Sequence, residues 1–213
     1  MNKLNCLISY FIRNAAYNLN KTEIVKMCYM FEYYHVQTYG KQYSGAIFIR
    51  YNYGPYTQEI DRSIDFFTSI GAVEKYECEY DQDRKVYYHS CANKDILGLY
   101  SLEREKEYIA DRVLKELCGL SYDTLISKVY STPPMERILE EERISYSKMY
   151  GRELNMYENK NIKKFSKEEL REARQRRTAE QDRGTDEEYY CHLNEQYHLY
   201  DDLRRRANAA SNN

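Results

Sequence analysis

The chain has 213 residues, enough to bury one sizeable hydrophobic core but short for two full domains. Its formal net charge of −2 and pI of about 6.2 exclude an overall basic field of the kind that draws proteins to nucleic acid or acidic membranes. It has 25 tyrosines and no tryptophan. Much of its apolar surface therefore consists of tyrosine rings that carry a hydroxyl, and such rings suit half-buried surfaces and interfaces. The alternative explanation for the excess of tyrosine is the codon composition of an AT-rich genome.

Cysteine usage and hydropathy indicate the compartment. The six cysteines form no Cys-x-x-Cys pair, which is typical of reduced thiols in a cytosol. No small-residue cleavage site follows the apolar residues 4–12, so a signal peptide is not expected. No apolar run approaches the roughly 20 residues that a membrane span needs. We therefore expect a soluble, cytoplasmic protein.

Two amphipathic helices are predicted at the start of the chain. Apolar residues at helical spacing place the first over residues 3–17. Asn20 and Glu23 have the spacing of a capping box, which predicts the start of a second helix. Gly40 is suited to end this helix, because a left-handed conformation costs glycine little.

A strand, a turn and a third helix are expected next. β-branched and aromatic residues predict a short buried strand over residues 46–51. Pro55 fixes its own φ and disfavours α geometry at Gly54, so the chain should turn at residues 52–55. The helix should then run from residue 56 or 57 to residue 70.

A β-hairpin is predicted from residues 73–80 and 84–91. With a two-residue loop, one face of this hairpin would pack against the core and the other would be wet. The packed face would carry Tyr76, Cys78, Tyr80, Tyr87, His89 and Cys91.

Three further helices complete the predicted globule. The first should begin at Ser101 and end near Cys118, and the second should run from Ser121 to Tyr130. Pro134 at a first helical turn predicts the third, along residues 135–143. The expected fold class is therefore α+β, mainly α: a compact helical domain of residues 1–150 with a short strand and a β-hairpin.

The composition of residues 151–213 predicts a charged C-terminal helical extension with a disordered end. Capping boxes at residues 166–169 and 185–188 predict two helices. The second helix carries a narrow apolar stripe, which needs something to lie against and is a candidate partner-binding surface. The stripe consists of Tyr190, Leu193, Tyr197, Tyr200 and Leu203.

Enzymatic and metal chemistry find little support in the sequence. Cys78, His89 and Cys91 would share a face of the hairpin, yet no Cys-x-x-Cys or His-x-x-x-His pair favours a zinc site. No nucleophile elbow or phosphate-binding glycine motif is present. The glutamates of residues 136–142 are typical of a solvated helix face. We therefore expect no catalytic residues, no metal and no cofactor.

DNA binding is the main alternative, because a helix followed by a hairpin resembles part of a winged helix. The predicted helix over residues 57–70 carries Glu59, Asp61 and Asp65 against the single cation Arg62. Such an acidic helix would repel phosphates, which counts against this interpretation.

The stretch between residues 39 and 71 resembles the Panacea (SocA-like) antitoxin-associated domain family. In that family a helix ends in Tyr-Gly, a strand follows, and a Tyr-Gly-Pro turn leads into the next helix. The resemblance covers about residues 19–143, and Cys28-Tyr29 stands at a Leu-Tyr-like pair. The matching motif residues are Tyr29, Tyr39, Gly40, Gly45, Tyr53, Gly54 and Pro55.

The resemblance implies an antitoxin of a bacterial or phage toxin-antitoxin system, which neutralises a cognate protein toxin by direct binding. The motif glycines and Pro55 are expected to hold the fold and shape a surface. The alternatives are a protease adaptor and a winged-helix-like DNA-binding transcriptional regulator. Members of the family often have a histidine and a tryptophan near the end of the domain, where this chain has residues 131–135, Ser-Thr-Pro-Pro-Met.

Overall fold

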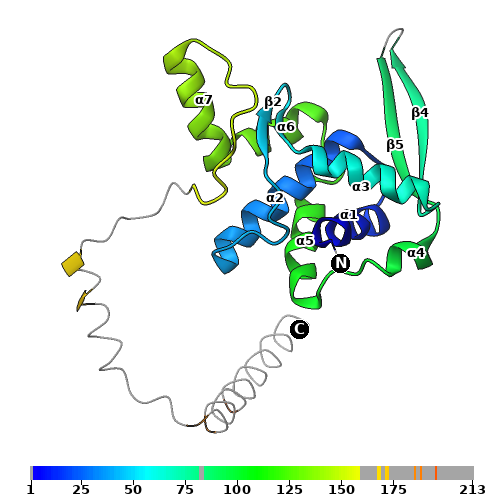
Figure 1. The fold of residues 1–213 in the computed structure, drawn as a ribbon, viewed down its shortest axis with the longest axis horizontal. Coiled ribbons are helices and arrows are strands. Elements are labelled where there is room, and N and C mark those ends of the chain that lie inside the picture. The colour runs from blue at the N-terminus through cyan, green and yellow to red at the C-terminus, as the bar shows by residue number, and fades with distance from the viewer. Residues whose placement is uncertain are drawn as a thin grey trace, which may run out of the picture. The chain divides into compact units, whose positions relative to one another are not determined.

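The computed structural model describes residues 2–81 and 84–158 (Figure 1), followed by a few single positions. Contacts divide the chain into two units, Met1–Asn161 and Ile162–Asn213, which we treat separately. The division into a domain of residues 1–150 and an extension stays a prediction. The single positions are Lys167, Glu168, Arg171, Glu172, Thr185, Glu188 and Glu195.

In the second unit, one predicted capping box is confirmed. The Thr185 backbone N–H donates to Glu188 Oε2 at 2.8 Å, and the Glu188 N–H donates to Thr185 Oγ1 at 3.3 Å. The five residues of the predicted apolar stripe, Tyr190 to Leu203, lie outside the described residues, as does the box at residues 166–169.

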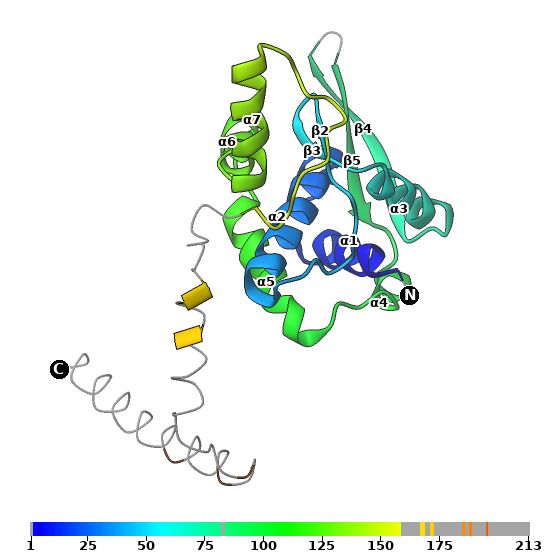
Figure 2. The same ribbon diagram turned by 60° about the vertical axis from the view of Figure 1, so that its left-hand side comes forward.

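Helix α2 (Lys21–Tyr39) lies at the centre of the first unit (Figures 1 and 2). The predicted capping box starts it: the Glu23 N–H donates to the Asn20 side chain at 3.0 Å, and the Asn20 N–H donates back to Glu23 at 2.8 Å. Gly40 ends it with φ +68°. Helix α1 (Lys3–Asn14), which packs on α2, ends three residues before the predicted boundary.

A two-stranded antiparallel ladder follows α2. Strand β2 (Ile49–Tyr51) pairs with β3 (Gly54–Tyr56), and helix α3 (Gln58–Ser69) begins after the N-cap Thr57. The predicted turn at residues 52–55 is therefore the tip of a tight hairpin. Sequence pattern missed β3, because a strand of three residues that contains a proline shows no alternation.

The long hairpin joins β4 (Val73–Asp81) to β5 (Arg84–Cys91), as predicted. A third strand, β1 (Leu19–Asn20), adds to the outer side of β5 and was not predicted, because two residues carry no strand pattern. Helix α3 packs on β4 and on α1, which joins the base of the hairpin to the helical core.

The predicted pairing of hairpin faces is wrong. Asp81 pairs with Arg84, as a two-residue loop requires, but an irregularity between Glu79 and Asp81 shifts the register by one residue. Tyr76 consequently lies opposite Tyr88, and Lys75 lies opposite His89. A one-residue slip moves every following side chain to the other face. Cys78 therefore pairs with Val86 on the face opposite to His89 and Cys91, so the three cannot share a metal ion from one face.

The remaining helices close the core. The helix expected from Ser101 begins later, after the N-cap Glu103, while the Ser121 N-cap is confirmed by a hydrogen bond from the Thr124 N–H at 3.3 Å. Pro133 and Pro134 occupy the first turn of the last helix, as their lack of an N–H favours. These helices are α4 (Lys94–Gly98), which was not predicted, α5 (Arg104–Leu117), α6 (Tyr122–Tyr130) and α7 (Pro133–Ser145).

The fold class is confirmed as α+β and mainly α. A continuous core joins α1, α2, α3 and α5, and its largest fully buried side chains include Tyr29, Phe31, Phe48 and Phe67. Within the described part of the chain, no helix combines the length and apolar character needed to cross a membrane.

Candidate partner-binding site

The tip of the β2–β3 hairpin depends on a glycine. Gly54 has φ +91°, a conformation that side-chain-bearing residues rarely adopt. A Cβ at this position would lie 2.5 Å from Cε1 of Tyr130 on α6, well inside van der Waals contact. The Tyr-Gly-Pro turn is therefore the point where the hairpin backbone rests on the Tyr130 ring.

A buried ion pair holds the other strand of this hairpin. The Arg50 guanidinium donates to both carboxylate oxygens of Glu142 on α7, at 3.1 and 3.4 Å, and the two side chains are only 3% and 4% exposed. The rings of Tyr130 and Tyr150 lie 5.6 and 5.5 Å from the guanidinium carbon. Burial would raise the pKa of Glu142, but hydrogen bonds from the Met149 N–H and Arg50 lower it.

The backbone around Arg50 is also fixed by a later segment. The Arg50 N–H donates to the Arg152 carbonyl at 2.7 Å, the Gly151 N–H donates to the Arg50 carbonyl at 2.8 Å, and the Leu154 N–H donates to the Phe48 carbonyl at 2.8 Å. This pairing and the ion pair hold β2 from two directions. The side chains that β2 and β3 present are therefore held on a rigid support.

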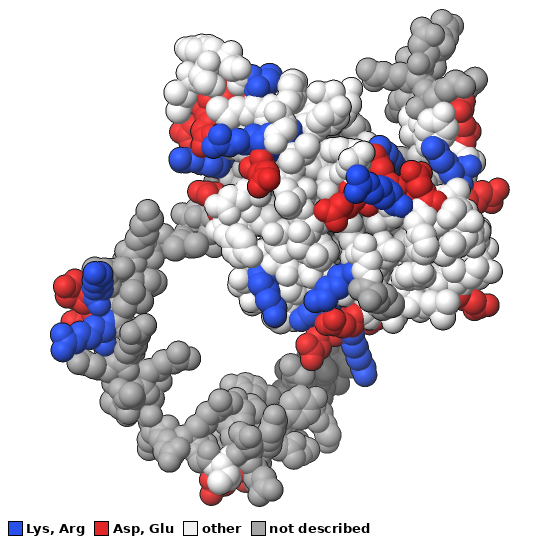
Figure 3. Space-filling view, in the orientation of Figure 1, with Lys and Arg blue, Asp and Glu red and all other residues white. Residues whose placement is uncertain are grey.

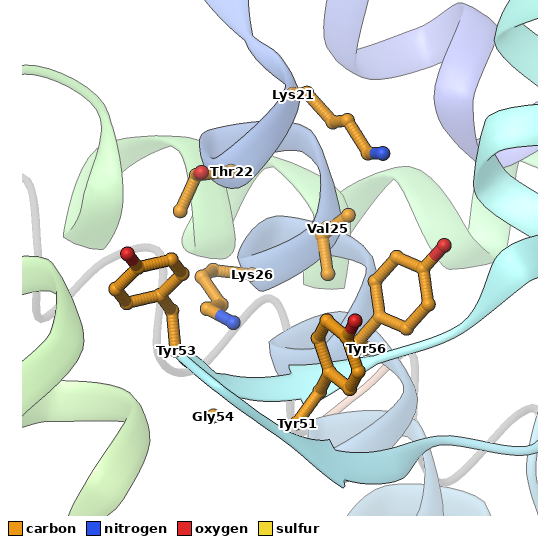
Figure 4. A pocket seen from close by; sticks show the side chains of 8 residues that line it. All are labelled: Lys21, Thr22, Val25, Lys26, Tyr51, Tyr53, Gly54 and Tyr56. Atoms are coloured by element: carbon orange, nitrogen blue, oxygen red, sulfur yellow. The ribbon is translucent and has the colours of Figure 1, made fainter. Parts of the chain in front are cut away.

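Beside this hairpin lies a pocket of about 280 Å³, between β2–β3 and the first turns of α2 (Figure 4). Tyrosine rings form much of its wall, and Tyr51 and Tyr56 lie 5.1 Å apart between ring centroids. Burial and a hydrogen bond to Asp61 raise the pKa of Tyr56 to about 12. The lining residues are Lys21, Thr22, Val25, Lys26, Tyr51, Tyr53, Gly54 and Tyr56.

Lys26 is the unusual member of this lining. Its side chain descends from α2 between Tyr53 and Tyr51 (Figure 4), and the residue is only 3% exposed. Its Nζ donates to the Pro55 carbonyl at 2.8 Å. Burial, reinforced by the charge of Arg50, lowers the pKa of Lys26 to about 7. A buried lysine with a strongly lowered pKa at the wall of a pocket marks a candidate functional site.

A second and larger hollow, about 670 Å³, lies on the other side of Tyr53. Thr22 and Tyr53 line both hollows, so Tyr53 stands between them. Its ring is 60% exposed and meets Tyr122 of α6 edge-on at 6.2 Å. Tyr88 and Val86 of β5 form the far wall. We name the two hollows together the tyrosine groove.

Two of the predicted motif residues lie in this groove and the others lie elsewhere. Tyr53 and Gly54 line it, and Pro55 contributes its carbonyl to Lys26. Tyr29 is fully buried, and its hydroxyl lies 2.7 Å from Thr132 Oγ1 at the start of α7. It joins two helices in the core and presents no surface.

Tyr39, Gly40 and Gly45 belong to the other end of α2. The Lys106 ammonium lies 3.5 Å from the centre of the Tyr39 ring, which also packs against His35. Glu32 accepts hydrogen bonds from the N–H groups of residues 43 and 44, at 2.6 and 2.8 Å. Gly45 has φ +76° in the loop that Glu32 holds. This end therefore serves the fold, and its contribution to binding stays a prediction.

Sequence reasoning missed most of the groove. Lys26 carried a detectable signal, because it is a charged residue between apolar positions of the α2 inner face. Arg50 is likewise the charged residue of a short apolar strand. Tyr51, Tyr56 and Tyr122 had none, since 25 tyrosines occur in the chain and the groove collects these three from separate elements.

Charges of both signs are interspersed on the face that Figure 3 shows, on α7 and around α3, with uncharged surface between them. Helix α3 carries Glu59, Asp61 and Asp65 against Arg62. A DNA-reading surface needs a contiguous array of cations. None is seen among the described residues of this face.

Comparison with known proteins identifies the family. Residues 24–134, just over half of the chain, match the family described as "Antitoxin SocA-like, Panacea domain". This range begins in the first turn of α2 and ends in the first turn of α7, so it includes the β2–β3 hairpin and most of the residues that line the tyrosine groove; residues 20–23 of the lining precede it. A comparison with curated proteins found no match. A comparison with solved structures also found none. The chain therefore belongs to the SocA-like antitoxin family, Panacea domain.

Proposed function

We propose that this protein is an antitoxin that neutralises a cognate protein toxin by direct binding, and that the tyrosine groove is the binding surface. The family match supports the antitoxin role. The observation that supports the surface is the exposure of Tyr53 and Tyr122, 60% and 50%, on a rigid support beside a pocket. Exposed tyrosines over a fixed backbone are typical of binding hot spots.

The physical basis of such binding is the removal of tyrosine rings from water. An aromatic ring that inserts into a partner buries a large apolar area, and its two side-chain torsions lose little entropy. The hydroxyl remains available for a hydrogen bond at the edge of the contact. Because Gly54 and Arg50 hold the hairpin in place, little reorganisation should oppose binding.

The test is co-expression with the product of the adjacent gene, scored by growth of the cells and by co-purification of the two proteins. Tyr53→Ala and Tyr122→Ala should each weaken the complex by about 2 kcal/mol or more, roughly 30-fold in Kd. Tyr108→Ala is the matched control, because Tyr108 is exposed on α5 away from the groove. Equal protection by the groove variants and the control would refute the assignment of the surface.

The C-terminal extension is a second proposed contributor, since the stripe from Tyr190 to Leu203 needs an apolar surface to lie against. Ending the chain after Tyr157 should weaken neutralisation if the stripe contacts the toxin. Full protection by the shortened chain would leave the groove as the whole binding surface.

A further inference from the structure

Among the cations that the structure describes at the pocket and its hairpin, Lys21 and Arg50 are paired with carboxylates and Lys26 is not. Lys21 Nζ lies 2.7 Å from Asp61, and Arg50 binds Glu142. Lys26 has no carboxylate within 4.0 Å among the described residues. An ammonium has three N–H donors, and the Pro55 carbonyl accepts one of them. Two donors of a buried cation therefore lack an acceptor among the described residues.

A buried charge with too few partners is costly, and a ligand that supplies the opposite charge would offset that cost. We propose that an Asp or Glu side chain of the partner protein enters the 280 Å³ pocket and pairs with Lys26. This inference rests on the proposed function, because it assumes that the tyrosine groove receives the partner. It adds the chemistry that the partner must present there.

The shape of the pocket favours a side chain over a cofactor or a free metabolite. Small-molecule sites usually have volumes of about 300–1,000 Å³. This pocket lies just below that range, and tyrosine rings rim it on both sides. Its one uncompensated cation matches a monovalent carboxylate. A phosphate would need several donors, of the kind that a helix N-terminus or a glycine-rich loop supplies.

The surroundings of the pocket also favour a protein. The larger hollow begins directly beyond Tyr53, so a chain segment whose carboxylate reaches Lys26 would continue along the rings of Tyr53 and Tyr122. The carboxylate would then be a desolvated charge contact at the centre of the interface, and the tyrosines would exclude water around it.

The first experiment uses the full chain with lysine labelled by 13C at Cε, so that NMR reports the Lys26 ammonium. The probes are N-acetylglutamate N-methylamide, its neutral glutamine analogue, and acetate. We expect the glutamate probe to raise the pKa of Lys26 by about one unit or more, since a nearby anion favours the charged amine. The glutamine analogue should have no such effect.

Two variants assign the effect to this pocket. Lys26→Met should abolish binding of the glutamate probe, and Lys115→Met, which removes an exposed lysine of α5, should leave it unchanged. An unchanged pKa of Lys26 in the presence of saturating glutamate probe would overturn the proposal. Acetate that binds as tightly as the glutamate probe would also overturn it, in favour of a site for free small carboxylates.

The second experiment uses the co-purified toxin complex. Lys26→Met should weaken the complex at least 10-fold, while Lys26→Arg, which keeps the charge, should retain more of the affinity. Equal Kd values for wild type and Lys26→Met would overturn the partner contact. If the wild-type chain captures no toxin, the proposed function fails, whereas the glutamate titration still decides whether the pocket binds a carboxylate.

Discussion

The backbone geometry of three glycines, one of them at the hairpin tip, predicts how much each Gly→Ala substitution changes the stability of the protein. Gly98 has an ordinary φ and open space around its Cβ position, Gly45 has φ +76° and open space, and Gly54 has φ +91° and Tyr130 Cε1 at 2.5 Å. Alanine therefore introduces no strain at Gly98 and backbone strain alone at Gly45. At Gly54 it introduces backbone strain together with a steric clash. The three variants are matched, because each adds one methyl group.

The magnitudes follow from these geometries. Alanine in a left-handed conformation costs about 1–2 kcal/mol, and the loss of unfolded-state freedom returns about 0.4–1 kcal/mol. Gly45→Ala should therefore lower the free energy of unfolding by about 1 kcal/mol, and Gly98→Ala should leave it unchanged or raise it slightly. Displacing the Tyr130 ring adds about 1–3 kcal/mol at Gly54. We expect Gly54→Ala to cost about 2–4 kcal/mol.

Urea unfolding followed by circular dichroism measures all three variants. A double-mutant cycle with Tyr130→Ala isolates the clash: about 1–3 kcal/mol of the Gly54→Ala loss should disappear when the ring is absent. If Gly54→Ala and Gly45→Ala agree within about 0.5 kcal/mol, the close contact with Tyr130 does not control the turn. The same result would remove our explanation of why the motif needs glycine there.

Three other predictions concern buried charge. Arg50→Met leaves Glu142 buried without its main partner and should cost about 3–5 kcal/mol in urea unfolding, whereas a loss below 1 kcal/mol would show that the pair is dispensable. The pKa of Lys26 is about 7 in the folded state, whereas an ordinary lysine has a pKa of 10.5, so the unfolded state binds more protons between these two pH values. The free energy of unfolding of the wild type should therefore rise by at most about 5 kcal/mol as the pH increases from 7 to 10.5. Lys26→Met should remove that rise, and a persistent rise in the variant would assign it to other groups. Burial lowers the pKa values of His35 and His89, so the unfolded state binds more protons than the folded state just below about pH 6.5. The free energy of unfolding should therefore fall as the pH drops below about 6.5. His35→Gln should flatten this fall, and an unchanged acid profile would contradict the assignment.

Most local signals in the sequence were reliable where the contact itself is local, although the helix expected from Ser101 begins after Glu103. The Asn20–Glu23 capping box, the left-handed Gly40 and the Ser121 cap each involve atoms within a few residues, and all three are confirmed. The hairpin shows where this reasoning fails. Its existence was predicted, but the irregularity between Glu79 and Asp81 shifted the register by one residue, so each face of the ladder combines a different set of β4 and β5 side chains than predicted.

The candidate site was only partly predictable for the same reason. The Tyr-Gly-Pro turn was recognised from three adjacent residues, and the structure places it at the tip of the β2–β3 hairpin. Its steric constraint comes from Tyr130, 76 positions further along the chain, and its ion pair joins Arg50 to Glu142 across 92 positions. A single sequence contains no record of which distant side chains meet.

By itself the sequence therefore determined several helix caps, the turn residues, the mainly helical class and the resemblance to an antitoxin family. These depend on backbone propensity and hydrogen bonds between near neighbours, which a short window of residues specifies. The tertiary structure alone decided that Lys26 is buried with no carboxylate partner among the described residues and that Tyr51, Tyr53 and Tyr122 surround one groove. Burial and pocket shape arise from packing between elements, and packing becomes defined when the whole chain has folded.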